Sequence, residues 1–132
     1  MKIFVYGTLK RGYWNSEILV KSSQLIRKTT VQGYMLYDVG FPVALPNAET
    51  KVSGEVWDIG DPNTTQSAKE TLLRLDALEG DGRMYNRLVV QDESGEDVHM
   101  YVGHPNCWNT SNERLRICPV KDGAYVWSSM RN

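Results

Sequence analysis

The 132-residue sequence is poor in the features that would assign it to a specialised class of protein. It has two cysteines, Cys107 and Cys118, which excludes a dense disulfide framework and leaves open whether these two pair. No apolar run approaches the ~20 residues of a membrane-spanning helix, and the start of the chain is too short in apolar residues for a signal peptide. We therefore expect an intracellular, cytoplasmic protein with no membrane partner.

The sequence also lacks an excess of either positive or negative charge. The formal net charge is −1, and the 15 Lys and Arg residues are scattered among 16 Asp and Glu residues. A nucleic-acid-binding protein needs a basic face, so this balance argues against a nucleic-acid partner. The two histidines and two cysteines between His99 and Cys118 match no standard zinc spacing, and there is no Cys-x-x-Cys pair. We expect no metal site.

The common catalytic and cofactor motifs are absent as well. The sequence has no Gly-x-Ser-x-Gly nucleophile motif, no Gly-x-x-x-x-Gly-Lys-Ser/Thr phosphate loop and no dinucleotide Gly-x-Gly-x-x-Gly. Neither cysteine has an obvious base partner. Any chemistry must therefore come from a simpler arrangement, and two stretches of the chain offer one.

The first stretch is a glycine-containing turn at the N-terminus. The apolar residues 3–5 predict a short buried strand that leads directly into Tyr6, Gly7, Thr8 and Leu9. Glycine after a buried strand lets the backbone turn and leaves consecutive N–H groups pointing outward. Such a loop binds a carboxylate, a phosphate or a developing oxyanion. The same pattern also describes an ordinary tight turn beside an edge strand.

The second stretch is a predicted helix over residues 65–78. Thr64 or Thr65 is a good N-cap, and Ala68, Leu72 and Leu75 recur on one helical face. Glu79 continues this apolar stripe where a core leucine would be expected. Desolvation and the negative end of the helix dipole both predict a raised pKa for Glu79, as a general acid–base catalyst requires. The alternative is a surface glutamate at a frayed helix end.

Other carboxylates compete with Glu79. Glu55 shares a strand face with Trp57 and is the one serious rival. Asp76, Glu17 and Glu70 have the pattern of solvated or capping positions. One carboxylate opposite a turn rich in free N–H groups suits proton transfer coupled to charge development on a carbonyl oxygen.

The rest of the chain predicts neighbouring strands more often than helices, within a single domain spanning residues 1–132. The expected elements are a short helix over 15–24, a strand pair around Gly33 in 25–37, an apolar loop at 40–46, a strand at 52–59, strands at 84–91 and 98–102 joined by an acidic turn, and a last strand at 124–127. Most of the segment 104–132 remains unassigned. This pattern favours an α+β domain with a mostly antiparallel or closed sheet over a doubly wound parallel sheet.

Several of these stretches together resemble the gamma-glutamyl cyclotransferase-like superfamily. Val5-Tyr6-Gly7-Thr8-Leu9-Lys10-Arg11-Gly12 resembles its opening, and Leu75-Asp76-Ala77-Leu78-Glu79-Gly80 with Tyr85-Asn86-Arg87 resembles its second signature. The segments 40–46 and 52–57 fit those usually found between. The likeness covers roughly residues 3–103 and is greatest to the gamma-glutamylamine cyclotransferase branch, and several ordered motifs are more specific than one.

This resemblance implies a fold, a site and an activity. The fold would be a small mixed or antiparallel β-barrel flanked by helices, with no metal and no cofactor. The backbone of Tyr6, Gly7, Thr8 and Leu9 would hold a small γ-glutamyl substrate, and Glu79 would act as general acid/base in cyclisation to 5-oxoproline. Tyr85 would orient the substrate or Glu79, whereas Arg87 would be structural.

Two further readings come from other functional classes. The domain could instead be a non-catalytic binding module that keeps the pocket for a small acidic metabolite. It could also be an interaction protein that recruits partners through residues 104–132. The intact loop and the carboxylate favour the enzyme over both.

Overall fold

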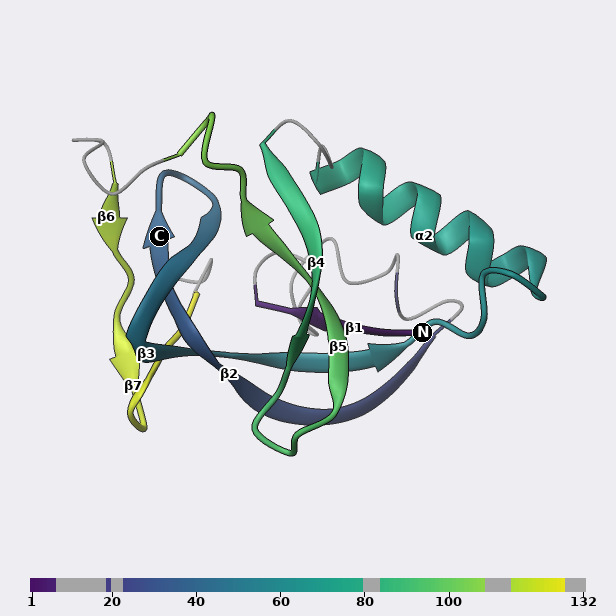
Figure 1. Cartoon of the computed structure of the whole chain (residues 1–132), viewed down its shortest axis with the longest axis horizontal. Helices are drawn as coiled ribbons and strands as arrows, with labels where there is room; N and C mark the ends of the chain where they lie inside the picture. The colour runs from purple at the N-terminus through teal and green to yellow at the C-terminus, as the bar shows by residue number, and fades with distance from the viewer. Residues whose placement is uncertain (7–18, 20–22, 80–83, 109–114, 128–132) are drawn as a thin grey trace.

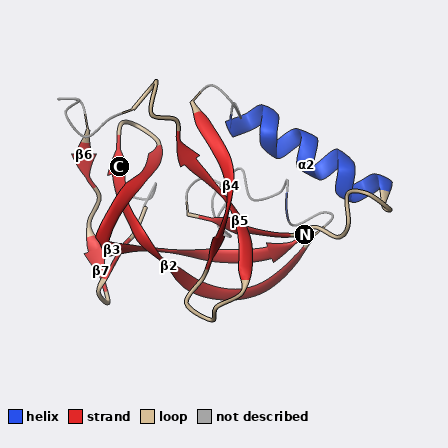
Figure 2. Cartoon of the chain, in the orientation of Figure 1, coloured by secondary structure: helices blue, strands red, loops and turns tan. Residues whose placement is uncertain are grey.

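The computed structural model describes residues 1–6, 19, 23–79, 84–108 and 115–127, with the backbone alone at 78 and 79. Within these residues, eight strands join one curled sheet, and a helix packs against it (Figure 1; Figure 2). The elements are β1 (Lys2–Val5), β2 (Gln24–Asp38), β3 (Pro42–Asp58), α2 (Gln66–Glu79), β4 (Tyr85–Gln91), β5 (Asp97–Gly103), β6 (Arg116–Ile117), β7 (Val120–Lys121) and β8 (Ala124–Tyr125).

The sheet is mixed and runs in the order β4-β5-β1-β3-β2-β6, with β7 and β8 attached beside β3. β1 pairs with β5 in parallel and with β3 in antiparallel, while β4 and β5 form an antiparallel hairpin. The helix α2 lies to one side of β4 and β5 (Figure 1). The predicted α+β class with a mixed sheet is confirmed.

The prediction of a strand pair around Gly33 is wrong, because residues 24–38 form the single strand β2. Gly33 adopts a φ of 100°, a conformation that favours glycine, and the register with β3 shifts between Gln32 and Tyr34. A register irregularity of this kind bends and twists a strand. The glycine therefore marks a bend within a long strand and not a turn between two strands.

The prediction of an apolar loop at 40–46 is also wrong. Pro42 is the first residue of β3, and Pro46 lies opposite Tyr34 of β2. This part of β3 has β2 as its strand partner, whereas pairing with β1 involves residues 55–58. A proline is tolerated at the start of a strand or where one side is unpaired, because no ladder hydrogen bond is lost there.

The two faces of the sheet carry separate hydrophobic cores. The helix-side core consists of Ile3, Val5, Leu19, Val43, Leu45, Trp57, Ile59, Leu75, Tyr85, Tyr101 and Trp108. The second core consists of Phe4, Tyr6, Val31, Leu36, Ala44, Val52, Val56, Val98, Met100, Val102, Cys118 and Trp127. Successive residues of β1 and β5 alternate between the two, as the pleat of a strand requires.

The helix and the hairpin agree with the sequence prediction. α2 spans Gln66–Glu79, within one residue of the expected bounds, and it buries Ala68 and Leu75. The strands β4 and β5 match the expected pair with its acidic turn. The helix expected over 15–24 falls largely outside the described residues, but Gln24 already begins β2.

The segment after β5 contributes to the second core. Cys118 and Trp127 are buried in it, and the short strands β6 and β8 pair with β2 and β3. Cys118 is a free thiol there, and Cys107 is a free thiol on the surface. The expected last strand at 124–127 is present as β8, limited to Ala124–Tyr125.

Candidate active site

The topology brings two of the predicted site residues, Tyr6 and Tyr85, to one end of the sheet. Because β1 is parallel to β5 and β5 is antiparallel to β4, the end of β1, the end of β5 and the start of β4 share one edge. Tyr6 follows the end of β1, and Tyr85 begins β4 opposite Gly103. Glu79 is the last residue of α2 and precedes β4 by a short connection. Gly7, Thr8, Leu9 and the side chain of Glu79 lie outside the described residues.

Tyr6 is anchored to the sheet just after the end of β1. Its side chain is buried in the second core, on the face away from α2. Its hydroxyl donates a hydrogen bond to the carbonyl of Tyr101 and accepts one from the N–H of Ala44 at 3.3 Å. The ring is thereby tied to β5 and β3.

Tyr85 is held on the opposite face, in the helix-side core. Its hydroxyl donates to the carbonyl of Pro42 at 2.6 Å. The preceding carbonyl, of Met84, accepts the N–H of His104 at 2.8 Å and the Nε1–H of Trp108 at 3.1 Å. These contacts fix the start of β4. Tyr85 therefore occupies a rigid position at this end of the sheet.

Glu55, the rival carboxylate, is buried at the same end of the sheet. It lies on β3 opposite Val5, and 3% of the residue is exposed. As predicted, it shares a face with Trp57, whose Nε1–H donates to Oε1 at 3.2 Å. This hydrogen bond joins two residues of the same strand, and the carboxylate is enclosed in the core.

The expectation that Asp76 is a solvated or capping residue is wrong. Its Oδ1 accepts a hydrogen bond from Arg87 Nε at 2.9 Å and another from the hydroxyl of Tyr101. Arg87 and Tyr101 face each other across β4 and β5. The sequence held one signal for this contact, since Asp76 adjoins the buried Leu75 and an arginine follows on the next strand.

His99 extends the polar cluster along β5. Its Nδ1 lies 3.4 Å from Nη1 of Arg87. Partial burial, followed by the positive charge of Arg87, lowers the pKa of His99. The neutral imidazole is therefore favoured beside the Arg87–Asp76 ion pair.

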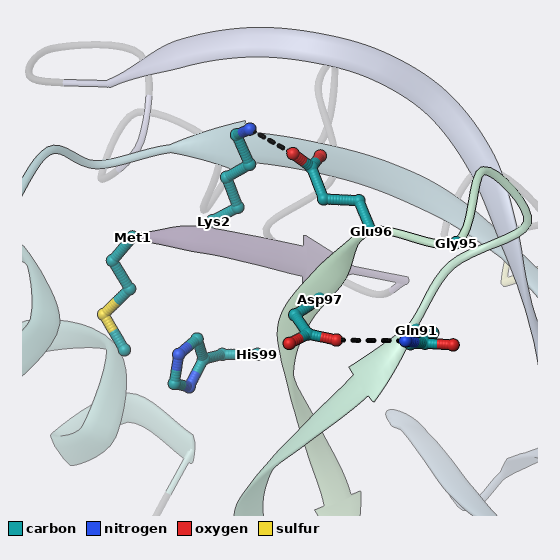
Figure 3. Close-up of a pocket in the computed structure, with 7 residues that line it drawn as sticks. All are labelled: Met1, Lys2, Gln91, Gly95, Glu96, Asp97 and His99. Carbon is teal, nitrogen blue, oxygen red and sulfur yellow. Dashed lines mark hydrogen bonds and ion pairs between the residues drawn. The ribbon is translucent and has the colours of Figure 1, made fainter.

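A cavity of about 570 Å³ opens at the other end of the sheet. It is lined by Met1, Lys2, Gln91, Gly95, Glu96, Asp97 and His99 (Figure 3). Met1 and Lys2 stand at the start of β1, and Gln91 ends β4, so this cavity is remote from Tyr6 and Tyr85. Two of its charged side chains, Lys2 and Glu96, pair with each other. The cavity is therefore distinct from the predicted site.

The described part of the chain offers neither a metal-binding cluster nor a membrane-spanning helix. No group of three or more His, Cys, Asp or Glu side chains there is placed to hold a metal ion. In the same residues, no helix is both long enough and apolar enough to cross a membrane.

The sequence and the fold both match a known family. The sequence model for gamma-glutamyl cyclotransferase, AIG2-like proteins matches residues 3–127. The chain belongs to this family, which confirms the resemblance drawn from the loop and helix motifs.

Individual relatives carry the same family name. The gamma-glutamylcyclotransferase family protein YtfP of Escherichia coli is 37% identical over 103 residues, covering 77% of this chain and 81% of YtfP. The solution NMR structure of that protein is similar with a TM-score of 0.66 at 29% identity, covering 98% of this chain and 97% of the other. A gamma-glutamylaminecyclotransferase of Rattus norvegicus is 32% identical over 100 residues, covering 67% of this chain and 61% of the rat protein.

Proposed function

We propose that the chain is an enzyme that cyclises the γ-glutamyl group of a small molecule to 5-oxoproline and releases an amine or amino acid. The observation that carries this proposal is that three elements lie near one sheet edge: the end of β1, the start of β4 and the end of α2, whose Asp76 contacts Arg87 of β4. Membership of the gamma-glutamyl cyclotransferase family supports the same reaction.

The proposed chemistry needs one proton carrier. The carboxylate of Glu79 takes a proton from the substrate's α-amine, and the amine nitrogen attacks the γ-carbonyl carbon of the same molecule. The bond from that carbon to the leaving nitrogen then breaks, and Glu79 returns the proton to the departing amine. Because the attack is intramolecular, the protein chiefly has to fold the substrate over and stabilise charge on the carbonyl oxygen.

The cradle would be formed by the backbone of Tyr6, Gly7, Thr8 and Leu9. Consecutive N–H groups after a strand can bind the substrate's carboxylate or the developing oxyanion. The bonds from the Tyr6 hydroxyl to β5 and β3 support this role, because they fix the point where the loop begins. Tyr85, held by Pro42, would form the opposite wall and orient the substrate or Glu79.

The test is a panel assay for product. Purified protein is incubated with a γ-glutamylamine, a γ-glutamyl amino acid and glutathione, and 5-oxoproline and the released amine are quantified by mass spectrometry. We expect the two products in a one-to-one ratio, with the γ-glutamylamine as the first substrate to examine given the rat relative's name. Binding in calorimetry without product from any compound would instead support the non-catalytic binding module.

A further inference from the structure

We propose that Asp76 is a positioning residue that fixes the last turn of α2 against the sheet and so sets where Glu79 presents its carboxylate. The inference rests on the proposed role of Glu79 and adds the group that holds this base in place. It starts from the contacts that Asp76 makes with Arg87 and Tyr101, which together form the Asp76 clamp.

The clamp joins the helix to two strands at once. Arg87 on β4 and Tyr101 on β5 are register partners, so their side chains stand next to each other on the helix side of the sheet. Both donate to Oδ1 of Asp76, and Arg87 Nη2 also lies 3.4 Å from Oδ2. The Asp76 and Arg87 side chains are 23% and 22% exposed, so solvent weakens this pair less than it weakens a surface pair.

Asp76 is close to the proposed base. It precedes Glu79 by three residues on the same helix, which places the two about 4.5 Å apart along the axis. The last turn of α2 contains no basic residue that could offset the negative end of the helix dipole. Arg87 contacts this turn from the neighbouring strand through Asp76, and the charges of the two side chains offset each other.

The β4 residue of the Asp76 clamp, Arg87, also adjoins the candidate site. Arg87 follows Tyr85 by two residues, so both side chains emerge on the same face of β4. Tyr85 is itself fixed to Pro42. The clamp therefore sets the distance between the strand that carries Tyr85 and the helix turn that carries Glu79, which is the geometry that proton transfer depends on.

The first test separates kcat from KM. Asp76→Asn keeps the size of the side chain and removes the charge that holds Arg87. We expect kcat to fall on the order of 10- to 100-fold with KM within about threefold, since a misplacement of about 1 Å can cost 100-fold. The matched control is Glu70→Gln on the same helix, because Glu70 is exposed and contacts Gln66 one turn away. We expect wild-type kinetics for the control.

The second test uses the pH profile of kcat/KM. A contact that is merely structural would not shift this profile in a defined direction. Asp76→Asn leaves the charge of Arg87 without its partner, which favours ionised Glu79 and shifts the acidic limb of kcat/KM to lower pH. Arg87→Gln leaves the Asp76 carboxylate and shifts the limb to higher pH. Measurements in a His99→Gln background remove the titration of His99, whose Nδ1 lies 3.4 Å from Nη1 of Arg87.

The outcomes are distinguishable. A wild-type protein that forms no 5-oxoproline would overturn the proposed function and this inference with it. An active wild type together with a folded Asp76→Asn variant of unchanged kcat and pH profile would overturn the inference alone. If Asp76→Asn does not fold, Tyr101→Phe removes one donor and keeps the ion pair. We expect it to lower kcat by a smaller factor at unchanged KM, and a wild-type kcat would contradict the clamp.

Discussion

Asp92 shows how a single side chain organises the hairpin of β4 and β5. Its Oδ1 accepts the N–H of Ser94 at 3.0 Å and that of Glu96 at 3.2 Å, and its Oδ2 accepts Arg27 Nη2 at 2.6 Å. Burial pushes the pKa of Asp92 upward, but the hydrogen bonds from the Ser94 hydroxyl and from Arg27 outweigh it and lower the pKa overall. The ionised carboxylate is thus part of the folded state.

This lowered pKa predicts a pH-dependent stability. The folded state holds the Asp92 proton less tightly than the unfolded state, so its contribution is present above the ordinary Asp pKa and is lost as pH falls through the folded value. Asp92→Asn should lower the free energy of unfolding by about 2–3 kcal/mol at pH 7 and flatten its fall below about pH 4. Urea unfolding between pH 3 and pH 7 measures both effects.

The control for Asp92 is Asp97→Asn, an exposed carboxylate whose amide partner, Gln91, lies at 3.4 Å. A surface change of this kind should alter stability by no more than about 0.5 kcal/mol. Equal losses of unfolding free energy in the two variants would show that Asp92 has no special role. So would an Asp92→Asn variant whose unfolding free energy falls with decreasing pH as steeply as that of the wild type.

Gly54 gives a second prediction at this scale. A Cβ at this position would lie 2.3 Å from the carbonyl oxygen of Val5 and 2.7 Å from a ring carbon of Phe4. The carbonyl oxygen of Val5 cannot move away without separating β3 from β1 just before Tyr6. Gly54→Ala should cost about 3 kcal/mol in thermal or urea unfolding, at the upper end of overpacking penalties. The neighbouring Ser53→Ala should cost much less, and equal costs would contradict the close approach.

Residue roles were predictable from the sequence where they follow from local periodicity. Strand alternation placed Glu55 and Trp57 on one face, and their hydrogen bond agrees. Asp76 was not predictable in this way, because its partners lie 11 and 25 residues away. Local pattern makes it an ordinary helix carboxylate, and the pairing of β4 with β5 creates its contacts.

Among the elements, α2 was the most predictable because its signals are local. The helical stripe of Ala68 and Leu75 depends on residues within the helix itself. The long strand β2 and the proline-containing start of β3 were mispredicted, since their conformation depends on pairing with each other. In an isolated sequence, Gly33 and Pro46 are typical of turns and strand ends. Pairing with a partner strand makes both compatible with a sheet.

The attachment of α2 to the sheet gives a prediction for the element that carries Glu79. Leu75 is fully buried in the helix-side core, whereas Leu73 on the same helix is 59% exposed. Leu75→Ala should lower the free energy of unfolding by about 2–5 kcal/mol, and Leu73→Ala by about 0.5 kcal/mol or less. Chemical denaturation of the two variants tests this, and comparable losses would mean that α2 does not pack through Leu75.

At the scale of the whole molecule, the order of the motifs was the most informative feature of the sequence. The glycine turn, the apolar helix ending in Glu79 and the following strand together indicated the family that the comparison of residues 3–127 shows. Apart from the last strand, the segment after β5 could not be assigned, because its strands are two residues long, and β6 and β8 pair with β2 and β3 from far along the chain. Such short strands carry no periodicity of their own.

The central claim is that Glu79, at the end of α2, is the base that cyclises a γ-glutamyl group. The most direct measurement is the rate of 5-oxoproline formation by Glu79→Gln, with wild type and Glu70→Gln assayed at equal folded concentration. We predict a loss on the order of 10²- to 10⁴-fold for Glu79→Gln, as expected for a general base, and none for Glu70→Gln. A folded Glu79→Gln protein that forms 5-oxoproline at the wild-type rate would contradict the account.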